Sequence, residues 1–124
     1  MDMKRYFTLP AEPIALIDPA TDEQGKDGKG EPATVTHKDV FRLVIQDARF
    51  RAEMDMGAIY DLKKKLTQDY SSEVELEEEE HSVLLPILRR PAVAAQGVVA
   101  LSDAALLSPG VVELFRSILN AQVK

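Results

Sequence analysis

The spacing of hydrophobic and polar positions changes along this chain, and each change predicts a different element. Near the N-terminus, residues 5–9 alternate polar side chains with aromatic and aliphatic ones, and residues 14–17 form a short apolar run. Both patterns are typical of strands. Because Pro10 and Pro13 separate the two segments and proline cannot donate to a strand ladder, we expect two short strands or one interrupted edge strand.

Residues 18–31, with the sequence DPATDEQGKDGKGE, interrupt the hydrophobic pattern. They contain three glycines, one proline and many charged residues, and no apolar side chain large enough to anchor them in a core. This composition predicts a solvated, hairpin-like loop rich in glycine and acidic residues.

A helical period begins after this loop. Thr36 is a candidate N-cap, and Asp39 follows three residues later, as in a capping box with a shorter acid. Apolar residues then recur on one helical face. They are Val40, Phe41, Val44, Ile45 and Ala48. We expect this helix to bend or break at residues 47–50.

A second helix is predicted for about residues 52–68, where apolar residues again recur at helical spacing. Gly57 disfavours helix, so residues 55–57 could equally form a turn. A polar connector at residues 69–72 then leads to a strand-like triplet at residues 74–76.

Two further helices are predicted in the last third of the chain. Residues 83–88 resume the helical spacing, and the sequence Arg-Arg-Pro at residues 89–91 is expected to end this helix. Pro86 either kinks it or lies in its first turns. Ser108 and Pro109 are a cap and a first helical residue, so the last helix begins there. Its apolar stripe comprises Val112, Phe115, Ile118 and Leu119.

These elements predict an α+β fold, mainly α, in a single domain over residues 1–124. Three to four helices are expected to pack on a short two- or three-stranded sheet formed by residues 6–8, residues 15–17 and, as an optional third strand, residues 74–76. The segment 92–107 is small and apolar. It is expected to be a loose helix or loop, and whether it joins the core or forms a contact surface stays open.

Composition narrows the classes of function. The chain has no cysteine, which excludes disulfides and thiolate chemistry. The net charge of −6 argues against sequence-independent binding of nucleic acid. No apolar run approaches the roughly 18–20 residues of a membrane-spanning helix, and the first ten residues lack the apolar region of a secretion signal. We therefore expect a cytosolic protein without a membrane partner or a direct nucleic-acid partner.

Catalytic and metal-binding groups have no clear candidate, so we expect no enzyme activity, no cofactor and no bound metal. The two histidines, His37 and His81, lie far apart in the sequence and are expected to be exposed and inert. The common phosphate, dinucleotide and zinc-protease motifs are absent from the sequence. Residues 18–31 fail the calcium-loop pattern, because Ala20 or Lys26 stands where an oxygen ligand is needed.

The strongest concentration of charge lies at residues 73–80. Acids in the first turn of a helix complement its dipole, and a charged strand face stays solvated, so the cluster has a purely structural explanation. The alternative is an acidic patch that docks on a basic surface of a partner protein. The candidate partner-binding residues are Glu73, Glu75, Glu77, Glu78, Glu79 and Glu80.

The order of the parts carries a family resemblance. A strand pair precedes the acidic, glycine-rich loop and the Thr36-capped helix. A second helix, the segment 74–88 with its acids and leucines, and a final helix ending in Ile-Leu-Asn-Ala at residues 118–121 follow. This order resembles that of small, mostly uncharacterised proteins encoded by tailed bacteriophages, from which the longer segment 92–107 departs. The resemblance implies a location in the host cytoplasm or the virion, and it implies no catalytic residue.

Three functions are open at this stage. The first is a non-enzymatic interaction protein of a bacteriophage, a minor virion component or assembly factor that binds capsid or tail subunits or itself. The second is a phage-encoded inhibitor of a host defence or nucleic-acid enzyme, in which residues 73–80 act as an anionic decoy. The third is a general interaction module of unknown role.

Overall fold

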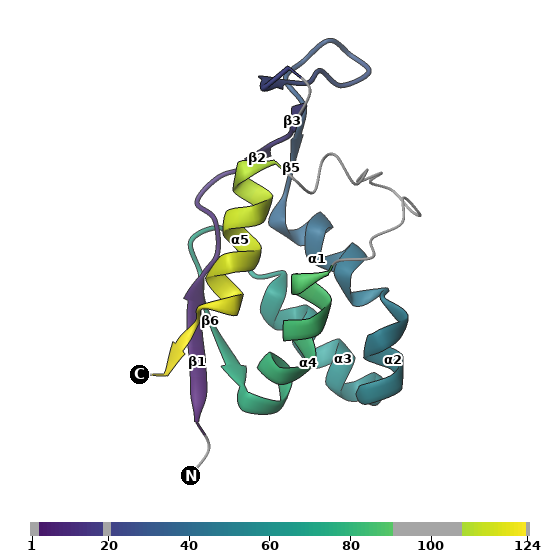
Figure 1. Ribbon diagram of the computed structural model, residues 1–124, viewed down its shortest axis with the longest axis vertical. Coiled ribbons are helices and arrows are strands. Elements are labelled where there is room, and N and C mark those ends of the chain that lie inside the picture. The colour runs from purple at the N-terminus through teal and green to yellow at the C-terminus, as the bar shows by residue number, and fades with distance from the viewer. Residues whose placement is uncertain (1–2, 19–20, 91–107, 124) are drawn as a thin grey trace.

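The computed structural model describes residues 3–18, 21–90 and 108–123. Within these ranges the chain forms five α-helices and several short antiparallel strands, so the prediction of an α+β, mainly helical fold is confirmed. Figure 1 shows the helices gathered beside one small sheet and a narrow projection at one end. No helix of the described part is long and apolar enough to cross a membrane. Segment 92–107 lies outside the described residues, so its predicted role is untested.

A three-stranded sheet forms one side of the body. Strand β1 (Lys4–Thr8) lies between β6 (Glu73–Glu77) and β7 (Gln122–Val123), and both neighbours are antiparallel to it. Arg5 pairs with Leu76 on one side and with Val123 on the other. The prediction of a strand at residues 74–76 is therefore confirmed.

One prediction about this sheet is wrong, because residues 15–17 are not part of it. Of the two alternatives for the N-terminal segments, the structure has two short strands, and β1 is the central strand of the sheet and not an interrupted edge strand. After β1 the backbone stays beside the start of β6 through hydrogen bonds from Leu9 N to Ser72 O and from Ser71 N to Pro10 O. Beyond the proline-containing turn, residues 14–18 leave the body and pair elsewhere. The third strand is β7, which is too short to produce an alternating pattern in the sequence.

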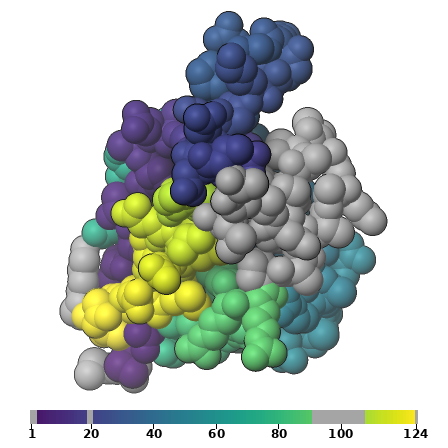
Figure 2. Space-filling view, turned by 45° about the horizontal axis from the view of Figure 1, so that its top comes forward, coloured from purple at the N-terminus to yellow at the C-terminus, as the bar shows by residue number. Residues whose placement is uncertain are grey.

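Residues 14–18 and 21–35 form the projection, which we call the arm. Strand β2 (Ile14–Ala15) pairs with β5 (Thr34–Val35), and β3 (Ile17–Asp18) pairs with β4 (Glu23–Gln24). A further bridge joins Lys26 to Pro32 near the tip. The loop predicted at residues 18–31 is thus an outer pair of hairpins, and Figures 1 and 2 show it standing clear of the body.

Three helices follow the arm, and their starts obey the capping chemistry of the sequence. Helix α1 (His37–Ile45) begins where Thr36 accepts a hydrogen bond from Asp39 N at 3.1 Å. The break after it is confirmed, because Asp47 caps α2 (Ala48–Glu53). The single helix predicted over residues 52–68 is wrong: α2 ends at Glu53, and Asp55 caps α3 (Met56–Leu66). The break therefore lies at residues 54–55, just before the turn offered as the alternative, and Gly57 is inside α3.

The last two helices complete the body. Helix α4 (Glu78–Arg89) ends where the Arg-Arg-Pro sequence predicts, with Pro86 in its interior and not in its first turn. Helix α5 (Pro109–Leu119) starts at the predicted residue. Its buried stripe differs from the prediction. Phe115 and Ile118 are buried as predicted, but Val112 and Leu119 are only partly buried, and Val111 and Leu114 are buried in their place.

The core lies between the sheet and the helices. Helices α4 and α5 contact β1, and α3 and α4 contact β6. The buried apolar side chains come from every one of these elements, and each removes apolar surface from water. Members without any exposed surface are Val40, Phe41, Val44, Phe50, Leu62, Leu66, Val74, Leu76, Leu84, Val111 and Ile118.

Candidate interaction site

The six candidate glutamates are divided between two elements. Glu73, Glu75 and Glu77 alternate along β6 with buried Val74 and Leu76, so they share the outer face of the strand. The other three occupy the first turn of α4, where their charges complement the helix dipole.

Two of these glutamates form ion pairs with β1. Lys4 Nζ lies 2.5 Å from Glu75 Oε1, a diagonal neighbour across the ladder, since Lys4 itself pairs with Glu77. The hydrogen bond from Lys4 lowers the pKa of Glu75, and the same contact raises the pKa of Lys4. Arg5 donates from Nε and Nη2 to the Glu78 carboxylate and from Nη1 to Ala121 O at 3.0 Å. Arg5 therefore links the sheet to the start of α4 and to the end of α5.

A third glutamate is buried. Glu80 Oε1 accepts a hydrogen bond from Lys65 Nζ at 2.6 Å and one from Glu77 N at 2.8 Å. Glu77 in turn accepts from the Glu80 backbone, which makes a capping box with glutamate at both ends. Three of the six glutamates thus form ion pairs with a lysine or arginine of this chain: Glu75, Glu78 and Glu80. Of the six, only Glu73 and Glu79 are exposed. This arrangement leaves a smaller anionic surface than the sequence suggests.

Both histidines are buried, so the prediction that they are exposed is wrong. His37 is 1% exposed and its Nε2 lies 2.6 Å from Gln68 O. His81 is 4% exposed and its Nε2 lies 2.9 Å from Ile118 O. Because a carbonyl oxygen can only accept, each Nε2 carries the proton. The rings hold α1 against the end of α3 and α4 against α5, which is a structural role.

Three hollows stand out among the described residues, and none of these three brings catalytic groups together. Within the described residues no group of three or more His, Cys, Asp or Glu side chains could hold a metal ion. One hollow, between α3 and the junction of β6 with α4, is lined mainly by charged side chains, including Asp61, Lys64 and Glu79. A second lies between α5 and the segment that leads into the arm. A third, shallow one lies beside β1 and the end of α5.

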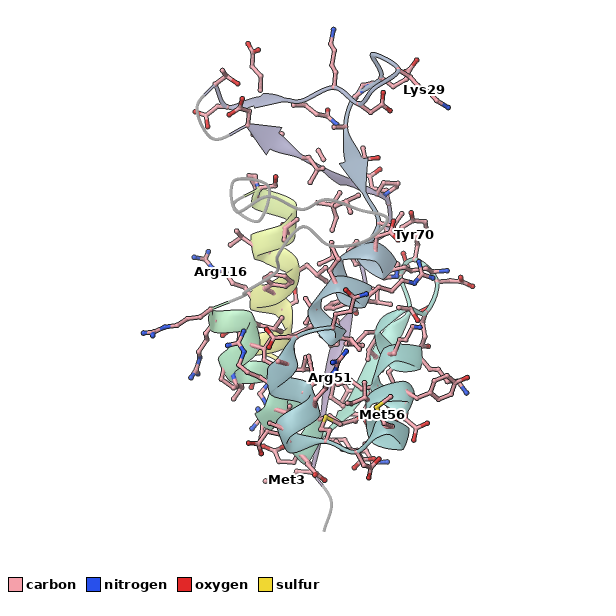
Figure 3. The ribbon with its side chains drawn as sticks, turned by 90° about the vertical axis from the view of Figure 1, so that its right-hand side faces the viewer. Met3, Lys29, Arg51, Met56, Tyr70 and Arg116 are labelled. Atoms are coloured by element: carbon pink, nitrogen blue, oxygen red, sulfur yellow. The ribbon has the colours of Figure 1, made fainter. Side chains whose placement is uncertain are left out.

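The arm is the most exposed ordered feature of the described chain. Its backbone is tied at a junction where Leu16 N donates to Ala33 O, Gly25 N to Leu16 O and Ala33 N to Gly25 O, at 2.8–3.1 Å. At the tip, Asp27 Oδ1 accepts from Lys29 N and Glu31 N. Figure 3 shows Lys29 at the far end of the arm.

The base of the arm is fixed to α5. Ile17 N donates to Ser108 Oγ at 2.9 Å, and Ser108 has no exposed surface. Ser108 therefore uses its side chain to hold the arm and makes no side-chain cap bond to its own helix. Gly110 lies so close to the arm that an added Cβ would be 2.6 Å from Ile14 Cγ2. The arm thus has a defined direction relative to the body.

Comparison with known proteins identified no family or relative of this chain. No protein-family model matches the chain, and searches of curated proteins and of solved structures found no significant match. Function must therefore be argued from the geometry of the chain itself.

Several functional elements could not be read from the sequence. Ser108 was recognised as a helix start, but its partner Ile17 is distant in the chain. The role of Arg49 was also missed: it pairs with Asp47 and donates to Pro86 O and Arg90 O at the end of α4. The only available signal for the arm was the dense glycine and charge pattern of residues 18–31.

Proposed function

We propose that this protein is a non-enzymatic protein–protein interaction protein whose arm is the recognition element. The resemblance of the chain to small proteins of tailed bacteriophages supports a role as a minor virion component or assembly factor. Its partner would then be a capsid or tail subunit, and its location the host cytoplasm or the virion.

The observation that carries this proposal is the combination of order and exposure in the arm. Every residue from 26 to 32 is exposed, yet the backbone there is held by a bridge and by the hydrogen bonds to Asp27. An ordered projection loses less conformational entropy on binding than a flexible loop does, because its backbone is already fixed. Its side chains contribute little to the core, so recognition explains their arrangement better than stability does.

The chemistry of the body supports the same class of function. His37 and His81 are enclosed and bonded to backbone carbonyls, so neither is placed to exchange protons with a substrate. Three of the six clustered glutamates are paired with cations of the chain. These arrangements stabilise the body and leave the arm and the hollows as surfaces for a partner.

The test uses a tip-shortened variant, in which residues 27–31 are replaced by Asn-Gly. Lys26 and Pro32 already pair across this segment, and Asn-Gly is the preferred two-residue hairpin turn. The replacement removes one net negative charge, so Glu53→Gln, which changes an exposed residue of α2, is a matched control.

The tagged wild-type protein and both variants would be recovered from infected or native cells at low and high salt. We expect a capsid or tail protein to co-purify with the wild-type and Glu53→Gln proteins, and at least tenfold less of it with the tip-shortened variant. Equal recovery with all three would contradict a recognition role for the arm. Recovery of a host nuclease or other nucleic-acid enzyme that is released by salt would favour the anionic inhibitor instead.

A further inference from the structure

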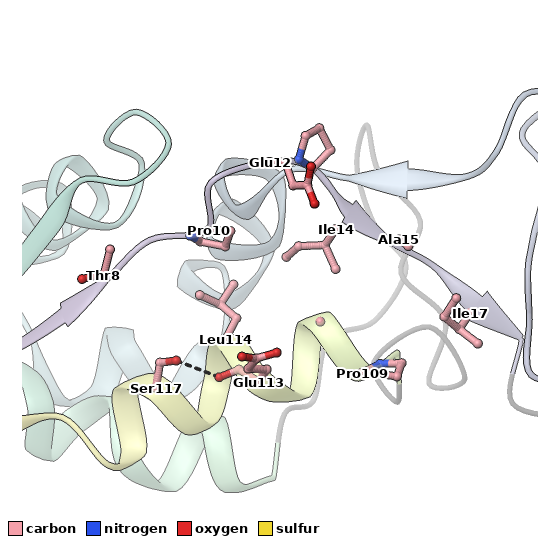
Figure 4. Close-up of a pocket in the computed structure, with 12 residues that line it drawn as sticks. Thr8, Pro10, Glu12, Ile14, Ala15, Ile17, Pro109, Glu113, Leu114 and Ser117 are labelled. Carbon is pink, nitrogen blue, oxygen red and sulfur yellow. Dashed lines mark hydrogen bonds between the residues drawn. The ribbon is translucent and has the colours of Figure 1, made fainter.

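The hollow between α5 and residues 8–17 has apolar residues along both walls. It occupies about 490 Å³, within the usual range for binding pockets. One wall is the segment that leads from β1 into the arm, and the other is the outer face of α5. Figure 4 shows Ile14 and Leu114 between these two walls.

The walls are rigid before anything binds. Pro10 and Pro13 stand on one wall and Pro109 on the other, and proline fixes its own backbone φ angle. The first wall is also tied at both ends, by the hydrogen bond from Ser71 N to Pro10 O and by that from Ile17 N to Ser108 Oγ. A preformed hollow requires little reorganisation when it binds a ligand.

Among the described residues, two carboxylates border this apolar hollow and no cation does. Glu12 lies on the arm wall and Glu113 on α5, both are exposed, and the lining contains no Lys, Arg or His. Neither carboxylate takes part in an ion pair within the described part of the chain, in contrast to Glu75, Glu78 and Glu80. In Figure 4 the Glu12 carboxylate points from the upper wall towards the helix.

From this combination we propose that the hollow between α5 and residues 8–17 binds a segment of a partner protein that presents one arginine beside an apolar residue. The apolar residue contacts Ile14 and Leu114, and the guanidinium lies between Glu12 and Glu113. Arginine fits better than lysine because its planar group can donate to two carboxylates at once. This inference rests on the proposed function, since it assigns a second contact surface to an interaction protein.

The experiment selects ligands from a displayed library of random heptapeptides on the immobilised wild-type protein. The selected peptides are then synthesised, and their Kd is measured by fluorescence anisotropy on three proteins. These are the wild type, the double variant Glu12→Gln/Glu113→Gln and the control Glu53→Gln/Asp61→Asn, which removes two exposed acids elsewhere. All changes are at exposed positions, so the variants are expected to fold.

We expect the selected peptides to carry an arginine next to an apolar residue. Their Kd should rise at least tenfold on Glu12→Gln/Glu113→Gln and stay within twofold on the control. Replacing the arginine of a peptide by citrulline, its neutral analogue, should have a similar effect. Selection of no peptide, or of peptides without a basic residue, or an equal Kd on all three proteins, would overturn the proposal.

Two further outcomes are distinguished by the same proteins. Self-association of the wild type that is lost in Glu12→Gln/Glu113→Gln would overturn the proposal in favour of a second copy as the occupant. The tip-shortened variant should bind the peptides as the wild type does, because residues 27–31 do not line the hollow. If the selected peptides bind the hollow but the tip-shortened variant recovers as much partner protein as the wild type, the proposed role of the arm is refuted. The proposed role of the hollow is then still supported.

Discussion

In the body, Phe41, Leu62 and Leu84 have no exposed surface, whereas in the arm residues 21–24 and 26–32 are all exposed. Both regions are ordered, but by different interactions. The body depends on the removal of apolar side chains from water. Residues 21–32 of the arm depend on backbone hydrogen bonds and turn geometry, whereas Ile14 and Val35 at its base are buried in the core. A region that is ordered without burying its side chains can change its surface with little effect on the rest of the fold.

The largest effect is expected in the body. Phe41→Ala should lower the free energy of unfolding by about 3–5 kcal/mol, because it removes a fully buried ring and leaves a cavity. Equilibrium denaturation in urea measures this loss. A loss of under about 1 kcal/mol would mean that the helices are not packed as described.

The joint between the two regions should respond next. Gly110→Ala would place a Cβ 2.6 Å from Ile14 Cγ2, and this β-branched side chain has little freedom to move. We expect a loss of about 1–3 kcal/mol in the free energy of unfolding. Adding Ile14→Leu, which removes the Cγ2 methyl group, should recover part of it. An unchanged or higher stability of Gly110→Ala would show that the arm does not approach α5 so closely.

A second change at the joint tests the hydrogen bond that fixes the arm. Ser108→Ala leaves Ile17 N without its acceptor and should lower the free energy of unfolding by about 1–2 kcal/mol. Hydrogen exchange at Ile17 should become faster, while exchange at Leu62 keeps its rank among the slowest amides. Unchanged exchange at Ile17 would argue against this bond.

Within the body, Asp47 predicts a pH dependence. The hydrogen bond from Arg49 lowers the pKa of Asp47 below its ordinary value. A carboxylate with a lowered folded-state pKa stabilises the fold above its unfolded pKa, and this contribution is lost as pH falls through the folded pKa. Asp47→Asn keeps a good helix cap but loses the ion pair, so we expect it to be less stable by about 1 kcal/mol at pH 7.

The same comparison at low pH provides the control for Asp47. Chemical denaturation at about pH 2, below the ordinary range of aspartate, should show no difference between wild type and Asp47→Asn. If the free energy of unfolding differs between wild type and Asp47→Asn by the same amount at both pH values, the ion pair of Asp47 with Arg49 is not the cause of that difference.

The smallest effect is expected in the arm. The tip-shortened variant should unfold with a free energy within about 0.5 kcal/mol of the wild type, because no buried side chain is removed and a shorter loop changes the chain entropy only slightly. Urea denaturation of both proteins measures this difference. A loss comparable to that of Phe41→Ala would show that the arm is part of the core.

These two regions also differ in how far the sequence predicts them. The sequence predicts the helix cap at Thr36, the strand at residues 74–76 and the start of α5, because capping and periodicity act between near neighbours. The partner strand β7 and the burial of His37 and His81 were not, because each depends on contacts between distant parts of the chain.

The candidate site shows the same limit. The sequence identifies Glu73–Glu80 as a dense run of acids, but only the fold shows that Lys4, Arg5 and Lys65 neutralise three of them. The hollow bounded by Glu12 and Glu113 joins residues about a hundred positions apart, so no local pattern could reveal it.

The recognition role of the arm is tested most directly by measuring how much partner protein each mole of tip-shortened protein recovers, relative to the wild type and to Glu53→Gln. We expect at least a tenfold lower recovery by the tip-shortened protein alone, at a stability close to that of the wild type. Equal recovery by all three proteins would contradict a recognition role for the arm, because residues 27–31 would then contribute to neither stability nor binding.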